Sequence, residues 1–219
     1  MMNNLNGCFT IMDWNMVKGA IRLQVTSNEK DTKGVLYKQY ADLYVIPCFQ
    51  IISDKARKMV KITNKICQYF DITKESVFKT AFENMLSEAR LLSDVDIIGE
   101  ILSMNSYTMN YMKDKLPDKF TFLTLTNEYH NNAAAAVFCP EVQMRLSELF
   151  PEGYYLLPSS IHEFLIYPYD GCTVENLLEV VKDVNRTLVS EIDFLSDNVY
   201  YFDKNDNFCI AYSDVKSVC

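Results

Sequence analysis

Short apolar runs of two different periodicities recur along this chain. Residues 18–25 and 58–63 alternate apolar with polar side chains, and this period of two indicates a half-buried strand. After Thr73 the apolar residues recur every three or four positions, which indicates an amphipathic helix with Thr73 as its N-cap. Strands interspersed with single helices favour an α+β fold, which we expect to be mainly antiparallel sheet with helices packed on one face.

The same patterns predict further elements. We expect strands over residues 43–52, 120–126, 133–138, 154–157, 164–167, 199–202 and 208–212, although the alanine run at 133–138 is also compatible with a helix. Helices are expected from Pro140 and Thr173 and over residues 95–104, with an ordered connection over residues 105–118. Turn residues around positions 53–54 and 203–207 predict two hairpins.

We expect one compact body composed of two halves, residues 1–105 and 106–219. The chain has 219 residues, 49% of them apolar, and only 6 glycines and 6 prolines, which is enough for a core and indicates no flexible linker. Residues 44–47 and 155–158 are alike, and each stretch is followed by a predicted strand and helix. This likeness predicts two similar half-domains that arose by duplication.

Charge and hydropathy limit the partners of the chain. Its formal net charge of −8 makes nucleic acid a poor partner, because binding to phosphates depends on Lys and Arg. The basic stretch at 55–58, with Lys61 and Lys65, is typical of a solvated surface. No apolar run approaches the roughly 20 residues of a membrane helix, and residues 1–16 lack the features of a secretory signal. We therefore expect a cytoplasmic protein with no membrane partner.

The cysteines and histidines indicate neither a redox nor a metal site. Seven cysteines occur singly without a C-x-x-C pair, which favours reduced thiols, and those in apolar segments are expected to be buried: Cys48, Cys67, Cys139 and Cys209. The two histidines, His130 and His162, have no zinc-ligand spacing around them. Glycine-rich phosphate loops and the G-x-S-x-G motif do not occur either. We predict no metal and no cofactor.

One polar cluster has the residue types of a nucleophile and a base. Ser159, Ser160, His162 and Glu163 place hydroxyls, an imidazole and a carboxylate within five residues. Neighbours along an extended strand point to opposite faces, however, and no glycine-flanked elbow exposes either serine. We therefore interpret the cluster as structural, with hydroxyls that cap backbone groups and His162 in a polar pocket. No catalytic residue is assigned, and these four residues are the candidates of an alternative, enzymatic interpretation.

The same stretch carries a resemblance to a known family. Residues 156–163 (L-L-P-S-S-I-H-E), together with residues 125–127 (L-T-N), 184–185 and 195–200, resemble a widespread bacterial family known only as a domain of unknown function. The similarity covers residues 17–212, more weakly in the first half. The chain resembles an N-terminally shortened, divergent member, with Ala133 where the family commonly has glycine. The resemblance implies no catalytic residues, and it marks an interaction or structural motif: Asn127, Pro158, Ser159, Ser160, His162 and Glu163.

Three functions are compatible with the sequence. The first is a non-enzymatic interaction or regulatory protein that binds another protein, in regulation or in conflict between a host and a mobile element. The second is an enzyme of unrecognised class that uses the cluster around His162. The third is a small-ligand sensor, which needs an enclosed apolar pocket. We favour the first because the sequence has no complete catalytic motif and an acidic balance of charge.

Overall fold

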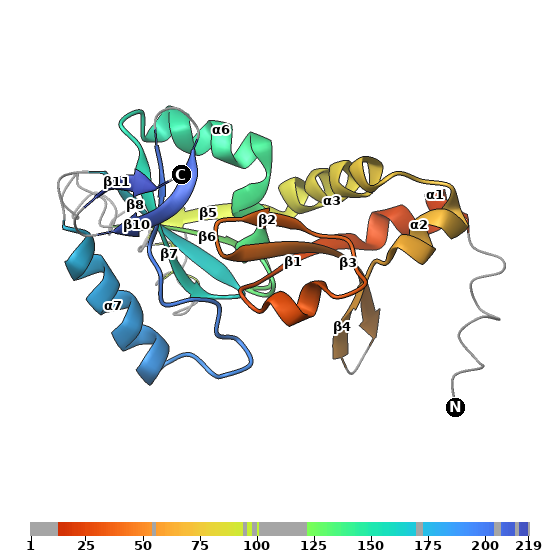
Figure 1. Ribbon diagram of the computed structural model, residues 1–219, viewed down its shortest axis with the longest axis horizontal. Coiled ribbons are helices and arrows are strands. Elements are labelled where there is room, and N and C mark those ends of the chain that lie inside the picture. The colour runs from red at the N-terminus through yellow and green to blue at the C-terminus, as the bar shows by residue number, and fades with distance from the viewer. Residues whose placement is uncertain are drawn as a thin grey trace.

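Two antiparallel sheets form the molecule (Figure 1). The computed structural model describes residues 13–53, 56–93, 96–97, 100, 122–169, 173–203, 207–212 and 215–218. The first sheet contains β1 (Ile21–Thr26), β2 (Lys38–Tyr40), β3 (Leu43–Ser53) and β4 (Ala56–Lys61). The central strand is β3, which pairs with β1 along one edge and with β2 and β4, end to end, along the other.

The second sheet has seven strands in the order β11-β10-β9-β7-β8-β6-β5. These are β5 (Ala89–Ser93), β6 (Leu123–Asn127), β7 (Tyr154–Ser160), β8 (Glu163–Pro168), β9 (Tyr200–Phe202), β10 (Phe208–Tyr212) and β11 (Val215–Val218). All of its pairs are antiparallel, so the predicted α+β class is confirmed. Within the described part of the chain, no strand pairs with the outer edge of β5.

The long helices begin where their capping residues predict. Helix α3 (Lys74–Glu88) follows Thr73, whose hydroxyl accepts a hydrogen bond from the backbone N–H of Ser76 at 3.1 Å. Helix α6 (Pro140–Leu149) starts at its proline, and α7 (Val174–Thr187) follows Thr173. The shorter helices were not predicted: α1 (Trp14–Val17), α2 (Asn64–Phe70) and the 3-10 helices η2 (Lys18–Ala20) and η3 (Glu29–Thr32).

The alanine run forms a 3-10 helix, η4 (Ala134–Phe138), and the predicted strand is wrong here. Every residue of η4 is buried, and η4 contacts β1 of the first sheet as well as β6 and β8 of the second. Its first turn is held by the β7–β8 turn, because the N–H of Ala133 donates to the carbonyl of His162 at 3.2 Å. The small alanine side chains allow this close approach, and η4 joins the two sheets into one core.

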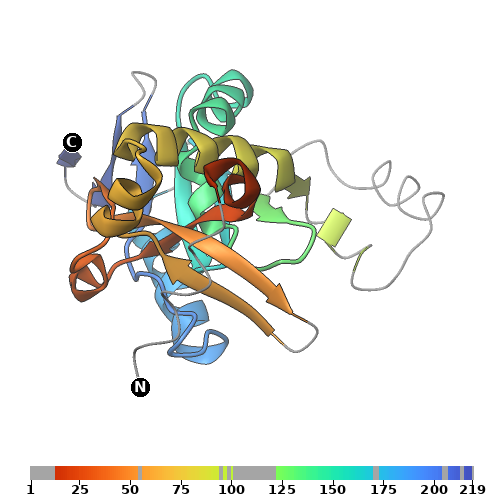
Figure 2. The same cartoon turned by 90° about the vertical axis from the view of Figure 1, so that its right-hand side faces the viewer.

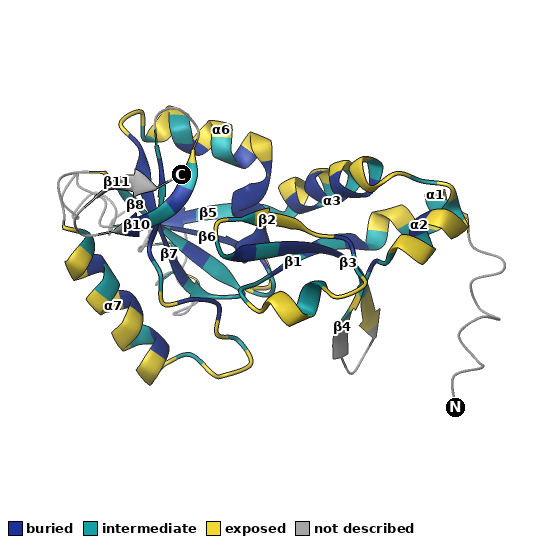
Figure 3. Cartoon of the chain, in the orientation of Figure 1, coloured by how far each residue is buried: buried dark blue, intermediate teal, exposed yellow. Residues whose placement is uncertain are grey.

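Helices cover both faces of the second sheet rather than one (Figure 1). Tyr154 and Leu156 of β7 point toward η4 and α6, whereas Tyr155 and Leu157 point to the opposite face. There they pack with Leu177 and Val181 of α7, among other residues. The buried residues of α7 are Leu177, Val181 and Asn185, and Figure 3 shows the mixture of buried, intermediate and exposed residues along this helix. Both faces of β7 are therefore apolar, which explains its continuous run of buried residues.

The two halves of the chain differ in strand order. Strand β3 pairs with both β1 and β4, whereas β6 pairs with β8 and not with β7. The likeness between residues 44–47 and 155–158 is therefore not accompanied by the same strand order. The expected boundary at 105/106, the helix predicted over 95–104 and the connection over 105–118 lie outside the described residues, apart from Asp96, Ile97 and Glu100.

The β3–β4 hairpin projects from the body (Figure 2). Its strand residues Ile51 and Ile52 are both exposed although they point to opposite faces, because no described helix or strand covers this end of the sheet. Lys58 is exposed as well, and Lys61 forms an ion pair with Asp31 at 2.6 Å. Of the basic stretch at 55–58, the described side chain of Lys58 thus lies on an exposed hairpin, as the charge pattern predicts.

The four cysteines of the apolar segments are free and buried, as predicted. Burial raises the pKa of Cys48 and of Cys139 to about 12 in each case, so both are thiols at neutral pH. Among the described residues, no helix is long and apolar enough to cross a membrane. No group of three or more metal-ligating side chains is found among them either.

Candidate functional site

Asn127, at the end of β6, shapes the loop over residues 128–132. Its side-chain oxygen accepts the backbone N–H groups of Tyr129 and Asn131, each at 3.1 Å. Its amide nitrogen donates to the carbonyl of Asn131 at 2.9 Å. His130 and Asn132 adopt left-handed backbone conformations, with φ values of 47° and 51°. In this sharp turn the buried side chain of Asn127 therefore supplies hydrogen-bond partners to the backbone groups of Tyr129 and Asn131.

His162 lies in the β7–β8 turn and holds the far end of this loop. Its Nδ1 accepts the N–H of Asn132 at 3.1 Å, and its Nε2 lies 3.1 Å from Oδ1 of Asp193. Because Nδ1 is an acceptor, this pattern assigns the ring proton to Nε2, which donates to the carboxylate. Ser190 donates to the other oxygen of Asp193 at 2.7 Å. The imidazole of His162 and the hydroxyl of Ser190 thus both bond to the carboxylate of Asp193 rather than to each other.

The remaining residues of the predicted motif shape the turn. The hydroxyl of Ser160 accepts the N–H of His162 at 3.0 Å, and the β7–β8 register shifts between Pro158 and Ser160. Ser159 and Glu163 are half-buried strand residues. In the described structure no hydrogen bond or ion pair links Glu163 to His162. The structure therefore brings His162 to Asn132 and Asp193, which the sequence analysis did not single out.

The stretches 184–185 and 195–200, which also resemble the family, lie outside this turn and help to join the two sheets. Asp42, which precedes β3, accepts hydrogen bonds from Asn198 and from the hydroxyl of Tyr200, each at 2.9 Å. Asn185 of α7 donates to the carbonyl of Ser196 at 2.9 Å. These bonds fix the segment before β9 between the first sheet and α7.

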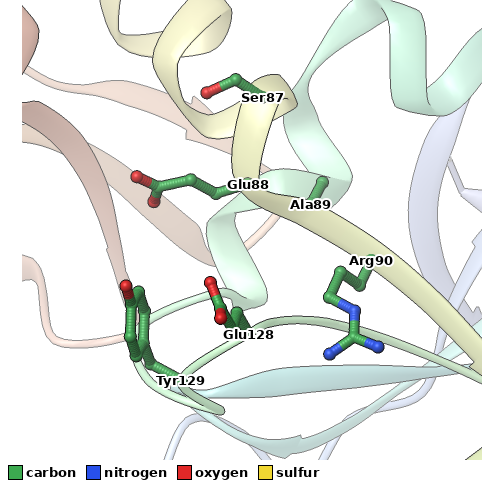
Figure 4. A pocket seen from close by; sticks show the side chains of 6 residues that line it. All are labelled: Ser87, Glu88, Ala89, Arg90, Glu128 and Tyr129. Carbon is green, nitrogen blue, oxygen red and sulfur yellow. The ribbon is translucent and has the colours of Figure 1, made fainter.

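A polar hollow of about 490 Å³ lies beside the loop that Asn127 shapes (Figure 4). Six residues line it: Ser87, Glu88, Ala89, Arg90, Glu128 and Tyr129. They come from the end of α3, the start of β5 and the loop after β6. None of these six residues was predicted to belong to a site, and the one local signal in the sequence is their neighbour Asn127.

The charged groups at this hollow are mostly paired. Glu88 binds the guanidinium of Arg22 through both carboxylate oxygens, at 2.5 and 3.0 Å. Glu100 bridges Arg90 at 2.6 Å and the imidazole of His130 at 3.1 Å. Burial alone raises the pKa of Glu100, but hydrogen bonds from His130 and Arg90 outweigh burial and hold that pKa below its ordinary value. Glu100 is therefore ionised at neutral pH.

Glu128 differs from these groups. It is exposed, its carboxylate faces the hollow in Figure 4, and it forms no ion pair with any described residue. The hollow is thus lined by two carboxylates and one guanidinium, and the guanidinium forms an ion pair with Glu100.

A second hollow, of about 340 Å³, lies on the other face of β5. Its apolar lining comes from α3, β5, β6 and α6: Leu86, Ala89, Leu91, Leu125, Val142, Leu146 and Leu149, with Glu141 and Arg145 at its border. Leu149 lines this opening and is 48% exposed. The outer edge of β5 therefore runs between an apolar and a polar hollow.

Two threonine hydroxyls of β6 are buried and have no hydrogen-bond partner among the residues that the structure describes, Oγ1 of Thr124 and of Thr126. A buried hydroxyl without a partner costs about 1 kcal/mol or more of stability. We expect Thr126→Val to raise the free energy of unfolding by about 1 kcal/mol in urea denaturation, because the methyl group replaces the hydroxyl at nearly equal volume. The control is Thr187→Val, since the exposed Thr187 hydroxyl does bond, to the carbonyl of Asp183. A loss of stability in Thr126→Val would show that this hydroxyl has a partner.

Comparison with known proteins shows to which family the chain belongs. Residues 3–204 match the model of a family of unknown function, DUF5688. The chain belongs to the DUF5688 family. The matched residues include Asn127, His162 and the linings of both hollows, so the site lies within the part of the chain that defines the family. No curated protein and no solved structure matches this DUF5688 protein.

Proposed function

We propose that this DUF5688 protein is a non-enzymatic, cytoplasmic protein that acts by binding another protein at the outer edge of β5. The observation that carries the proposal is an edge strand without a paired neighbour among the described residues, with an open hollow on each of its faces. Such edges are places where proteins pair with other chains unless they are blocked. Free thiols at four buried cysteines accord with a reducing compartment.

The polar cluster supports binding rather than catalysis. A general base needs a ring nitrogen that is open to substrate, whereas His162 directs Nδ1 to the N–H of Asn132 and Nε2 to Asp193. Ser160 accepts a backbone N–H, so its hydroxyl oxygen also serves the turn. We interpret this cluster as the support of the 128–132 loop, which forms one wall of the polar hollow.

Site-specific photo-crosslinking tests the proposal. A photoreactive amino acid is placed at Tyr129, which lines the polar hollow, or at Tyr69 of α2 as a control, since both side chains are about half exposed. In cells of the source organism we expect one discrete crosslinked protein at Tyr129 and none at Tyr69. Absence of any crosslinked product at Tyr129, Glu128 and Leu149 alike would reject a partner at this edge.

A further inference from the structure

The backbone of β5 offers hydrogen-bonding groups on its outer side. The N–H of Ser93 donates to Oδ2 of Asp96 at 3.0 Å and therefore does not point toward β6. Backbone groups alternate in direction along a strand, so the N–H and C=O of Leu91, two residues earlier, point to the same outer side. An added strand would find one donor and one acceptor at Leu91, next to the acceptor of Ala89.

The two hollows are arranged to receive alternate side chains of such a strand. Leu91 lines the apolar hollow, and the adjacent Arg90 lines the polar one. Neighbouring residues of a strand point to opposite faces, and a residue opposite Leu91 in an added strand points to the face of Leu91. One side chain of the added strand would therefore enter the apolar hollow, and the next would lie over the polar hollow.

The charges around the polar hollow determine which side chain of a partner it favours. Around it the carboxylates of Glu88, Glu100 and Glu128 outnumber the guanidinium groups of Arg22 and Arg90. Glu128 has no counter-ion among the described residues, and the whole chain carries a formal charge of −8. A basic side chain gains an unpaired carboxylate here, whereas an acidic one meets like charge.

We propose that the partner binds through an extended segment that adds as a strand to β5, with an apolar residue in the apolar hollow and an adjacent Lys or Arg against Glu128. This inference rests on the proposed function. In this mode of recognition, main-chain hydrogen bonds supply affinity and the alternate side-chain sites supply specificity. The recognised motif is short, alternates apolar with basic residues and contains no proline at the position that bonds to Leu91.

Selection from a library of random ten-residue peptides on the full chain tests this motif. We expect enriched peptides in which an apolar residue is followed or preceded directly by Lys or Arg. Glu128→Lys and Leu149→Lys should each raise the Kd of a selected peptide at least about tenfold. The matched controls Glu179→Lys on α7 and Met144→Lys on α6 should leave the Kd unchanged, because both residues are exposed outside the two hollows.

Amide hydrogen exchange of Leu91 tests the strand pairing itself. Exchange at Leu91 should slow on addition of the peptide, whereas exposed amides of α7 should not change. Peptides that lack the alternation, bind both site variants as tightly as the wild type, or leave Leu91 unprotected would overturn the inference. A crosslinked partner at Tyr129 together with no enriched peptides would also overturn the inference. In that case the proposed function would stand, but the partner would bind through a folded surface and not through an extended segment. A crosslinked product at the mass of two copies of this chain would identify a second copy as the occupant and also overturn the inference.

Discussion

Phe138→Ala is expected to lower the free energy of unfolding by about 3–5 kcal/mol, the range for deleting a fully buried aromatic side chain. Phe138 ends η4 and is 1% exposed. Its ring stacks on Tyr40 of the first sheet at a centroid distance of 4.4 Å and meets Phe208 of the second sheet at 5.3 Å. The substitution thus leaves a cavity where the two sheets meet, and this part of the core is too closely packed to collapse fully.

Urea unfolding followed by fluorescence and by circular dichroism measures this loss. Phe194→Ala is the matched control, because Phe194 is 42% exposed and should change stability by less than about 1 kcal/mol. We expect a single transition for the wild type, since η4 contacts both sheets. Equal stability of Phe138→Ala and Phe194→Ala would contradict the assignment of η4 to the shared core.

Asn127→Ala is expected to lower the free energy of unfolding by about 2–3 kcal/mol, because three hydrogen bonds within the 128–131 turn are lost together. The loop then loses the support that holds Tyr129 beside the polar hollow, so the Tyr129 crosslink should weaken at temperatures where the variant is still folded. Thermal denaturation and the crosslinking yield measure the two effects separately.

Asn127→Asp separates the contributions of the two ends of this amide. It retains an oxygen that accepts the N–H groups of Tyr129 and Asn131 but lacks the donor to the carbonyl of Asn131. Its stability should lie between those of the wild type and Asn127→Ala. Asn176→Ala, at an exposed position of α7, is the control for loss of an amide. If Asn127→Ala were as stable as this control, the turn would not depend on the side chain.

Local chemistry accounts for most elements that were predicted correctly. The N-cap of Thr73, the proline at the start of α6 and the alternation along β1 act over a few neighbouring residues, so they can be read directly from the chain. The β5 strand was missed because it follows α3 without a turn residue, and its pairing partner β6 begins about thirty positions later in the sequence.

The side chains of the candidate site were predicted only in part, because some of their contacts are local in the sequence and others join distant segments. Asn127, Ser160 and His162 were singled out, and their structural use follows from short-range bonding of polar side chains to backbone groups. Asp193 lies 31 residues from His162, and no local pattern links the two. The linings of both hollows combine α3, β5, the loop after β6 and α6, which only sheet pairing brings together.

The class of fold, the starts of the long helices and the burial of the four cysteines can be predicted from the sequence, because each depends on interactions within a few residues or on burial of apolar side chains. Tertiary structure alone decided that the alanine run becomes a 3-10 helix between two sheets, that helices cover both faces of the second sheet, and that β5 forms its edge. These features depend on contacts between distant segments, in which packing overrides local propensity.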